Sequence, residues 1–584
     1  MSFSMWLRVK DGLPEYGEGI GLIYRTDRKT NVKEFLLNRL DQSFRDIEKG
    51  YLKFNRDLSK GRSLPKGTEW ILDNFYLIEL SYRALKIDLK KEQKIILNII
   101  EADSLKDYPR AYALALELIS HSAGNITEEG LIDFINAFQR EEILTLEEIA
   151  RFSTVLTLGL MEYIRNIVLN LVKTSNIWEK IENIDITTEK NLDEIIENIH
   201  TMDYTEIERI VRKIRGNRDE FQPILDAMDK RLDYIGKSIK DILEREYTIQ
   251  SKYKVSLGYG IDSIRNISSL NWERVFNSIS LVEKVFKEDP LDVYGNMDYH
   301  SKNYYRNETQ QLAEKFNVQE IFISKKALEL AREQWDKGSR DKKAHIGYYL
   351  VDKGRRELFD YFGHMDKDMG IYLGKYGYYY FPIVLLSILL TCFFSGYAYS
   401  RGNLYWGILI FIVSFIPIMT ISTNILNYFY FKEFKPKVLP KIHYKQDIPK
   451  EYSTFVVIPT LLPDANRVEE LARSLEVYYL SNNEKNIYFG IVGDFKDGNA
   501  QTTEDDKKII DKGLEIIKEL NEKYSKEEDI FYFFHRKRVY SKTQDKWMGW
   551  ERKRGALVEF NNLLLGDKNT TFNVISGDIS NIKI

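Results

Sequence analysis

The chain has 584 residues, room for about four domain-sized units. Lys and Arg total 85 and Asp and Glu total 88, so the net charge of -3 gives no global electrostatic reason to bind nucleic acid. A single cysteine, Cys392, excludes an internal disulfide and a cysteine-based zinc site. Seven scattered histidines without HExxH spacing argue against a histidine-based metal site.

Residues 1–370 are predicted to form a mostly helical cytoplasmic region. Apolar residues spaced three and four apart, as on one face of a helix, include Leu225, Met228, Leu232, Ile235, Ile239 and Ile242. The glycine-rich segment 17–21 follows no strand pattern and leads to no P-loop lysine, which excludes a phosphate loop. Core packing between helices accounts for these stripes, and the residues of this region alone disclose no chemistry.

Two charge-free runs at 377–400 and 402–431 are separated only by Arg401. Each exceeds the roughly 20 apolar residues that a helix needs to cross the hydrocarbon core. The sequence therefore predicts a transmembrane hairpin over 377–431, with helices at about 378–399 and 404–428. A buried hairpin of a soluble protein is the alternative, but such helices rarely stay free of charge for so long. Interfacial aromatics are expected at Tyr378, Tyr379, Tyr380, Tyr405, Trp406, Tyr428 and Tyr430.

Basic residues flank the hairpin, and the connecting turn carries only Arg401. By the positive-inside rule both flanks are expected on the cytoplasmic side. No apolar stretch typical of a signal peptide follows Met1. The flanking cations are Arg355, Arg356, Lys367 and Lys375 before the hairpin, and Lys432, Lys435, Lys437, Lys441 and Lys445 after it.

Residues 445–584 show a different pattern, with short β-branched or aromatic runs at 454–460, 487–495 and 530–535. Amphipathic helical stretches separate these runs, so a parallel sheet with right-handed crossovers is predicted. Ligands bind such sheets at the carboxyl ends of the strands, where this prediction places Thr460 and Asp494. A carboxylate there can accept hydrogen bonds from a base or a ribose. Asp494 can equally cap a turn, because Asp-Phe-Lys-Asp-Gly is also good turn chemistry.

A basic, tryptophan-containing segment, KWMGWERKRGA, occupies 546–556. Lys553, Arg554 and Gly555 open a predicted helix over 556–565, and such an opening can hold a diphosphate through charge and helix N-terminal amides. A nucleic-acid patch would need more surrounding positive charge. A solvated or lipid-facing basic stretch is the other interpretation.

Several long segments resemble one known family. The strings TFVVIPTLL, YFGIVGDFKD and KWMGWERKRGALVEFNNLL are similar to the membrane glycosyltransferase module of cyclic β-1,2-glucan synthases, glycosyltransferase family 84. The resemblance covers nearly the whole chain. Segments of the amino-terminal region that share it are LPKGTEWILDNFYLIE, PRAYALALELISHSAG, VSLGYGIDSIRNISSLNW, LVEKVFKEDPLDVYGNMD and HIGYYLVDKGRREL.

The resemblance implies a multidomain protein with a mostly α-helical amino-terminal block, a two-helix transmembrane hairpin and an incomplete α/β GT-A-like glycosyltransferase domain at 445–584. It also implies a multi-pass protein of the bacterial inner membrane, with the amino terminus and the glycosyltransferase segment cytoplasmic. Such enzymes polymerise glucose from UDP-glucose into a β-1,2-glucan linked to the protein itself. The expected partners are UDP-glucose, the lipid bilayer, and the growing glucan on the same polypeptide or its carboxyl-terminal modules, with no nucleic acid.

By the same resemblance, Asp494 contacts the uracil or ribose, and Thr460 borders that pocket. Lys553, Arg554 and Gly555 lie beside the nucleotide, with Glu551 as a further candidate. A divalent cation, Mg or Mn, is expected in the complete enzyme on an Asp-x-Asp motif.

Asp578-Ile579-Ser580 is not such a motif, so no metal ligand is expected in this chain. The catalytic residues are expected beyond Ile584, and the chain is expected to be an amino-terminal piece that is inactive alone. The alternatives are a non-catalytic membrane scaffold that binds a partner, and another processive polysaccharide synthase.

Overall fold

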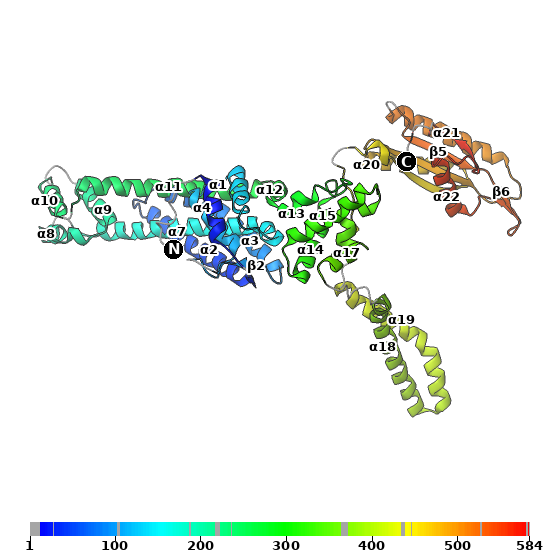
Figure 1. The fold of residues 1–584 in the computed structure, drawn as a ribbon, viewed down its shortest axis with the longest axis horizontal. Coiled ribbons are helices and arrows are strands. Elements are labelled where there is room, and N and C mark those ends of the chain that lie inside the picture. The colour runs from blue at the N-terminus through cyan, green and yellow to red at the C-terminus, as the bar shows by residue number, and fades with distance from the viewer. Residues whose placement is uncertain are drawn as a thin grey trace. The chain divides into compact units, whose positions relative to one another are not determined.

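The computed structural model describes residues 12–26, 28–101, 105–185, 189–215, 222–234, 236–363, 372–433, 439–444, 447–525, 528–577, 579 and 582. The chain divides into two compact units (Figure 1). The helical unit comprises Met1–Gly295 and Tyr299–Pro440, and the sheet unit comprises Asn296–Asp298 and Lys441–Ile584. The protein is mostly helical, with apolar helices and a small mixed sheet.

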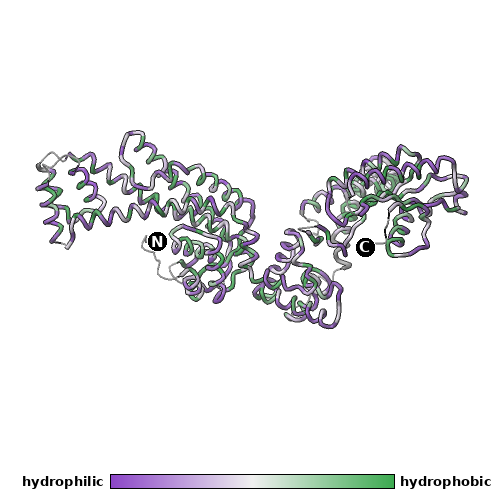
Figure 2. The backbone as a smooth tube through the Cα atoms, turned by 90° about the horizontal axis from the view of Figure 1, so that it is seen from above, coloured by the Kyte–Doolittle hydropathy of each residue, from purple (hydrophilic) through white to green (hydrophobic). Residues whose placement is uncertain are grey.

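The first part of the helical unit is built from long helices around a shared apolar core. Figure 2 shows hydrophobic and hydrophilic residues alternating along these helices, as expected when one face of each is buried. The helices are α1 (Leu13–Ile23), α2 (Lys33–Ser59), α3 (Thr68–Lys91), α4 (Arg110–His121), α5 (Glu128–Phe138), α6 (Leu146–Ala150), α7 (Phe152–Glu182), α8 (Glu189–Asn198), α9 (Tyr204–Arg215), α10 (Gln222–Asp233), α11 (Ile239–Ser269) and α12 (Trp272–Ile279).

A two-stranded antiparallel sheet, β1 (Arg28–Asn31) with β2 (Ile96–Ile99), lies within this helical part and was not expected from the sequence. Five shorter or amphipathic helices complete the region before the apolar pair. They are α13 (Leu281–Phe286), α14 (Tyr299–Phe316), α15 (Glu320–Asp336), α16 (Ile346–Val351) and α17 (Arg355–Tyr361).

The predicted apolar stripe from Leu225 to Ile242 is divided between two helices. Leu225, Met228 and Leu232 are buried on α10, whereas Ile239 and Ile242 are buried on α11. The break between the two helices ends at Ser238, whose side chain caps the first turn of α11 together with Asp241. Ile235 lies outside the described residues.

Three helices are long and apolar enough to cross a membrane, within the described part of the chain. α7 is one of them and was not singled out from the sequence. The most apolar window of α7 is 67% buried inside the protein, where it packs against α2, α4 and α11. Its hydrophobic surface is therefore already covered by neighbouring helices.

The other two helices, α18 (Tyr372–Arg401) and α19 (Leu404–Glu433), leave their apolar surfaces open. They pack against each other, and only 17% and 11% of their most apolar windows are buried. Hydrogen bonds join them near both ends, from Ser395 Oγ to the Gly407 carbonyl at 2.8 Å and from Tyr379 Oη to Asn427 Oδ1 at 2.9 Å. Such exposed apolar surface suits a membrane environment. Lys367, Lys435, Lys437 and Lys445, used above for the orientation, lie outside the described residues.

The sheet unit contains a four-stranded sheet in the order β3-β4-β5-β8. Its elements are β3 (Thr454–Leu462), α20 (Ala465–Ser481), β4 (Ile487–Phe495), α21 (Glu504–Tyr524), β5 (Phe531–Arg536), the hairpin β6 (Val539–Ser541) and β7 (Lys546–Met548), α22 (Arg552–Leu564) and β8 (Phe572–Ile575). The predicted parallel order of β3, β4 and β5 is confirmed. β8 adds an antiparallel strand on β5, so the sheet is mixed.

Helices cover both faces of this sheet. α20 and α21 pack on one face over a core that includes Phe489, Ile491 and Phe533, and α22 packs on the other face against Val492 and Phe534. β3 lies at the edge of the sheet and contains Pro459, a residue that sheets tolerate at their edges.

The contact between α2 and α7 depends on a glycine. A Cβ atom built on Gly50 would overlap the Cγ1 methyl of Val168, a β-branched side chain with little freedom to move. We expect Gly50→Ala to lower the free energy of unfolding by about 1–3 kcal/mol through overpacking. Gly19, on α1, has open space around it. Gly19→Ala is the matched control and should be neutral or stabilising by up to about 1 kcal/mol. Thermal unfolding of both variants tests this difference, and equal effects would contradict it.

Candidate functional site

The candidate site lies at the carboxyl ends of β4 and β5, where three segments of the sheet unit converge. These segments are the loop after β4, the end of β5, and the anchor turn, defined as residues 549–552. The strand register places Asp494 beside Arg536 and Gly493 beside His535. The same register places Thr460 beside Gly493 on the other neighbouring strand.

The structure places Thr460 and Asp494 on opposite faces of the sheet. Ile458 and Leu462 on β3 point toward α20 and α21. Because side chains alternate between the two faces along a strand, Thr460, which lies between them, is on that same face. Asp494 shares the alternation of Val492, which faces α22. Both residues lie near the carboxyl ends as predicted, but their side chains are not brought together.

Asp494 is bound by a fully buried arginine. Arg536 Nε lies 2.7 Å from Asp494 Oδ1, and Arg536 Nη2 lies 2.6 Å from Oδ2, so the pair is bidentate. The two side chains are 0% and 5% exposed. The carboxylate is thus used across the strands rather than to cap the 494–498 turn. Burial raises the pKa of Asp494, and the Arg536 guanidinium opposes that rise.

The same guanidinium holds the anchor turn. Arg536 Nη1 donates to the Trp550 carbonyl and Nη2 donates to the Arg552 carbonyl, both at 3.1 Å. Glu559 on α22 lies 3.6 Å from Nη1. One side chain therefore joins the end of β4, the end of β5 and the start of α22.

The anchor turn carries two consecutive non-glycine residues with left-handed backbone, Glu551 at φ 45° and Arg552 at φ 51°. Such conformations cost of order 1–3 kcal/mol each and persist only when the surroundings fix them. The hydrogen bonds from Arg536 to the carbonyls of Trp550 and Arg552 supply that constraint.

Two glycines let the backbone approach closely at this point. A Cβ atom on Gly549 would lie 2.6 Å from Asp494 Oδ2, and one on Gly555 would overlap the Trp550 carbonyl oxygen. The buried Gly555 thus serves the packing of α22 on the anchor turn. Its predicted position beside a nucleotide is compatible with this role.

The remaining predicted residues are exposed around the first turn of α22. Lys553 and Arg554 point into solvent, and Arg554 Nη1 lies 2.9 Å from Glu551 Oε2. At the start of α22 the Arg552 amide already donates to the Gly549 carbonyl at 3.1 Å, and the helix dipole favours an anion beside the amides that follow it. Cations in the first turn oppose that dipole, so their presence at this end favours an anionic ligand.

A second buried ion pair fixes the loop after β4. Arg538 Nη1 lies 2.6 Å from Asp506 Oδ2 at the start of α21, and its Nε donates to the Lys496 carbonyl at 2.8 Å. Gly498 and Trp547 exchange two backbone hydrogen bonds of 2.9 Å, which tie this loop to β7. Arg536 and Arg538 are therefore structural anchors and do not belong to an exposed basic patch.

No group of three histidine, cysteine, aspartate or glutamate side chains that could hold a metal ion occurs among the described residues. Asp578 and Ser580, which stand where a metal motif was expected, lie outside them. The expectation of a divalent cation in the complete enzyme stays a prediction.

His535 is fully buried behind the Asp494–Arg536 pair. Its ring lies 3.9 Å, centroid to centroid, from the ring of Phe495, on the face covered by α20 and α21. Burial lowers the pKa of His535 to about 4. The sequence places His535 at the end of the third predicted strand but assigns it no role.

Removing one member of the Asp494–Arg536 pair should leave the other as a buried charge without its counter-ion. We expect Asp494→Asn to lower the free energy of unfolding of the sheet unit by about 3–5 kcal/mol. The exposed pair of Asp497 with Arg552 provides the control, and Asp497→Asn should cost under about 1 kcal/mol. Hydrogen exchange of the sheet-unit amides reports both effects, and an Asp494→Asn protein as stable as Asp497→Asn would refute the structural role.

The buried neutral His535 should make stability depend on pH. Its folded pKa lies below the value of about 6.5 expected in the unfolded chain, so the contribution is complete above pH 6.5. It is lost as the pH falls toward 4, by about 3 kcal/mol in total. His535→Phe should flatten this pH dependence of unfolding, whereas replacing the exposed His443 by Gln should leave it unchanged. If the free energy of unfolding changed with pH equally in the wild type and in His535→Phe, His535 would not be the source of the pH dependence.

Comparison with known proteins gives one informative match. No family model matches the chain. The chain is 26% identical over 556 residues to the protein "Cyclic beta-(1,2)-glucan synthase NdvB" of Rhizobium meliloti (strain 1021), and the match covers 90% of the chain. The chain spans 19% of the length of that relative. The match confirms the resemblance to the cyclic β-1,2-glucan synthases that the sequence segments indicated.

Proposed function

We propose that this chain provides the donor-binding part of a membrane glycosyltransferase that polymerises glucose from UDP-glucose into a β-1,2-glucan. Similarity to a cyclic β-glucan synthase supports glucan synthesis and glycosyl transfer at the family level. The observation that carries the finer proposal is the pair of hydrogen bonds from Arg536 to the Trp550 and Arg552 carbonyls. It fixes the anchor turn so that the first turn of α22 presents Lys553 and Arg554 at the carboxyl edge of the sheet.

In this proposal the diphosphate of UDP-glucose lies at the first turn of α22. Lys553 and Arg554 supply positive charge, and the amides of the helix start supply donors of fixed direction. Glu551 holds Arg554 at 2.9 Å and thereby restricts where its guanidinium can reach. Asp494 acts mainly as a positioning residue, because Arg536 already engages both of its oxygens.

The uracil and ribose are proposed to lie over the carboxyl ends of β3 and β4. Thr460 is half-buried at the edge strand, whereas Asp494 is buried, faces the other side of the sheet and contributes by holding Arg536. A GT-A-like arrangement is part of this proposal. It is supported by the three parallel strands with helices on both faces.

A divalent cation, Mg or Mn, would stabilise the diphosphate leaving group in the complete enzyme. The described residues do not offer a fitting ligand set, so no part of donor binding is assigned to the metal here. We expect donor binding without glucan elongation by this chain alone. This expectation rests on Asp578-Ile579-Ser580 departing from the Asp-x-Asp motif that the resemblance implies.

The proposed location is the bacterial inner membrane, with α18 and α19 spanning the bilayer and the chain on both sides of this helix pair in the cytoplasm. Their open apolar surfaces and the basic residues on both sides of the pair support this orientation. The growing glucan is proposed to be attached to the same polypeptide.

Neutralising the cations of α22 should weaken UDP-glucose binding. We expect the double variant Lys553→Ala with Arg554→Ala to lower the affinity at least about tenfold, because each charge-assisted contact to a diphosphate contributes about 1.5 kcal/mol or more. Lys568, exposed beyond the other end of the same helix, gives the matched control, and Lys568→Ala should bind like the wild type. Titration of the detergent-solubilised chain with labelled UDP-glucose measures both.

Three results would speak against the proposal. Equally strong binding by the double variant and by Lys568→Ala would show that the diphosphate does not bind at α22. No binding by the wild type would favour a scaffold without nucleotide affinity. Robust glucan formation by the wild-type chain alone would refute the expected inactivity.

A further inference from the structure

The helical unit contains a cavity that takes no part in the proposed donor site. It has a volume of about 470 Å³ and lies between the 142–146 loop, the start of α13, the end of α14 and the start of α15. Part of its wall is apolar, formed by Leu144, Leu146, Leu281, Val282, Ala313, Val318 and Ile321. A volume of this size accommodates a small organic molecule.

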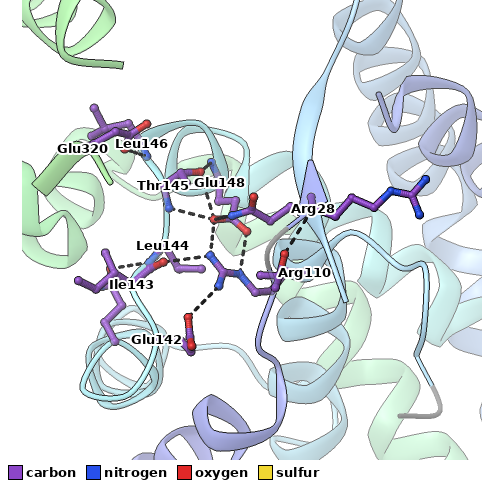
Figure 3. A network of polar contacts seen from close by, with 12 residues as sticks. Arg28, Arg110, Glu142, Ile143, Leu144, Thr145, Leu146, Glu148 and Glu320 are labelled. Atoms are coloured by element: carbon purple, nitrogen blue, oxygen red, sulfur yellow. Dashed lines mark hydrogen bonds and ion pairs between the residues drawn. The ribbon is translucent and has the colours of Figure 1, made fainter. Parts of the chain in front are cut away.

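One wall of the cavity is a rigid charged network (Figure 3). Arg110 is 2% exposed, and its guanidinium binds Glu148 through two hydrogen bonds of 2.9 and 2.7 Å. Arg110 Nη2 also donates to the Ile143 carbonyl at 3.0 Å, and Asn98 Nδ2 donates to Glu148 at 3.1 Å. The positive charge of Arg110 is thus compensated inside the protein, and its side chain holds the 142–146 loop in place.

Glu320 is a buried carboxylate in the wall of this cavity. It is 7% exposed and stands at the start of α15, where Oε2 accepts a hydrogen bond of 2.7 Å from the Leu146 amide. Oε1 accepts no hydrogen bond from any residue that the structure describes. Burial raises the pKa of Glu320 to about 7. The charged groups that act on it are Lys29 on β1, Glu148 on α6 and Glu314 on α14.

The balance of charges indicates the sign of a ligand. The carboxylates of Glu142, Glu314 and Glu320 line the cavity together with the cations Arg110 and Lys29. Arg110 is already bound by Glu148 and lies 3.5 Å from Glu142, which leaves Glu314 and Glu320 against the exposed Lys29. An anion would meet these carboxylates. A sugar ring would find no aromatic side chain to stack on among the residues that line the cavity.

We propose that this cavity binds a small organic diamine, with one ammonium group at Glu320 Oε1 and the methylene chain against the apolar wall. The cation supplies hydrogen-bond donors for the free carboxylate oxygen, and pairing offsets the cost of burying that charge. Glu314, exposed at the cavity rim, is the counter-ion for the second ammonium.

Putrescine is the probe, titrated calorimetrically into the full chain in detergent micelles. The wild type should bind it, and Glu320→Gln should lower the affinity at least about tenfold while keeping an oxygen for the Leu146 amide. At pH 8, where Glu320 is ionised, Lys29→Gln should instead raise the affinity about two- to threefold, because it removes a like charge at an exposed position. Glu329→Gln, exposed on the same helix, should leave the affinity unchanged.

The pH dependence gives an independent readout. Wild-type affinity should rise about tenfold from pH 6 to pH 8 as Glu320 ionises, and Glu320→Gln should show no such rise. Absence of putrescine binding at millimolar concentration, or binding insensitive to Glu320→Gln, would overturn the proposal. Glu320-dependent binding of a neutral disaccharide or of inorganic phosphate would overturn the assigned ligand class.

Discussion

The sheet unit depends on a single buried guanidinium. Arg536 neutralises Asp494 and accounts for two carbonyls of the anchor turn, so the ends of β4 and β5 and the start of α22 share one electrostatic centre. Buried ion pairs are seldom strongly stabilising compared with apolar side chains of the same size, but a missing partner is costly. Because of this asymmetry, the main effect of the Asp494–Arg536 pair is to fix one arrangement of the chain and not to add stability. It selects one conformation of a strained turn that places basic side chains at the edge of the sheet.

Much of this architecture could be predicted from the sequence. The β-branched and aromatic runs at 454–460, 487–495 and 530–535 identified three strands, and the charge-free runs identified α18 and α19. These patterns are local, because the alternation of polar and apolar residues reflects burial of one face or of both. The predicted parallel order followed from the intervening helices.

The rest depends on contacts between distant residues. Arg536 and Arg538 follow a histidine and precede the KWMGWERKRGA segment, so they resemble part of one exposed basic stretch. Their partners, Asp494 and Asp506, lie 42 and 32 residues away, and only the packed sheet brings them together. Thr460 and Asp494 both stand near strand ends, but a register offset of one residue turns their side chains to opposite faces. Glu320 likewise carries no local signal of its cavity.

The edge position of β3 has a consequence for work on the isolated sheet unit. An edge strand exposes backbone donors and acceptors that can template pairing with another chain. β3 is nine residues long and is rich in β-branched side chains, which favours such pairing, whereas Pro459 removes one donor from it. A sheet unit produced on its own would therefore be prone to self-association through β3, and a charged residue introduced beside Pro459 would be a rational way to keep it monodisperse.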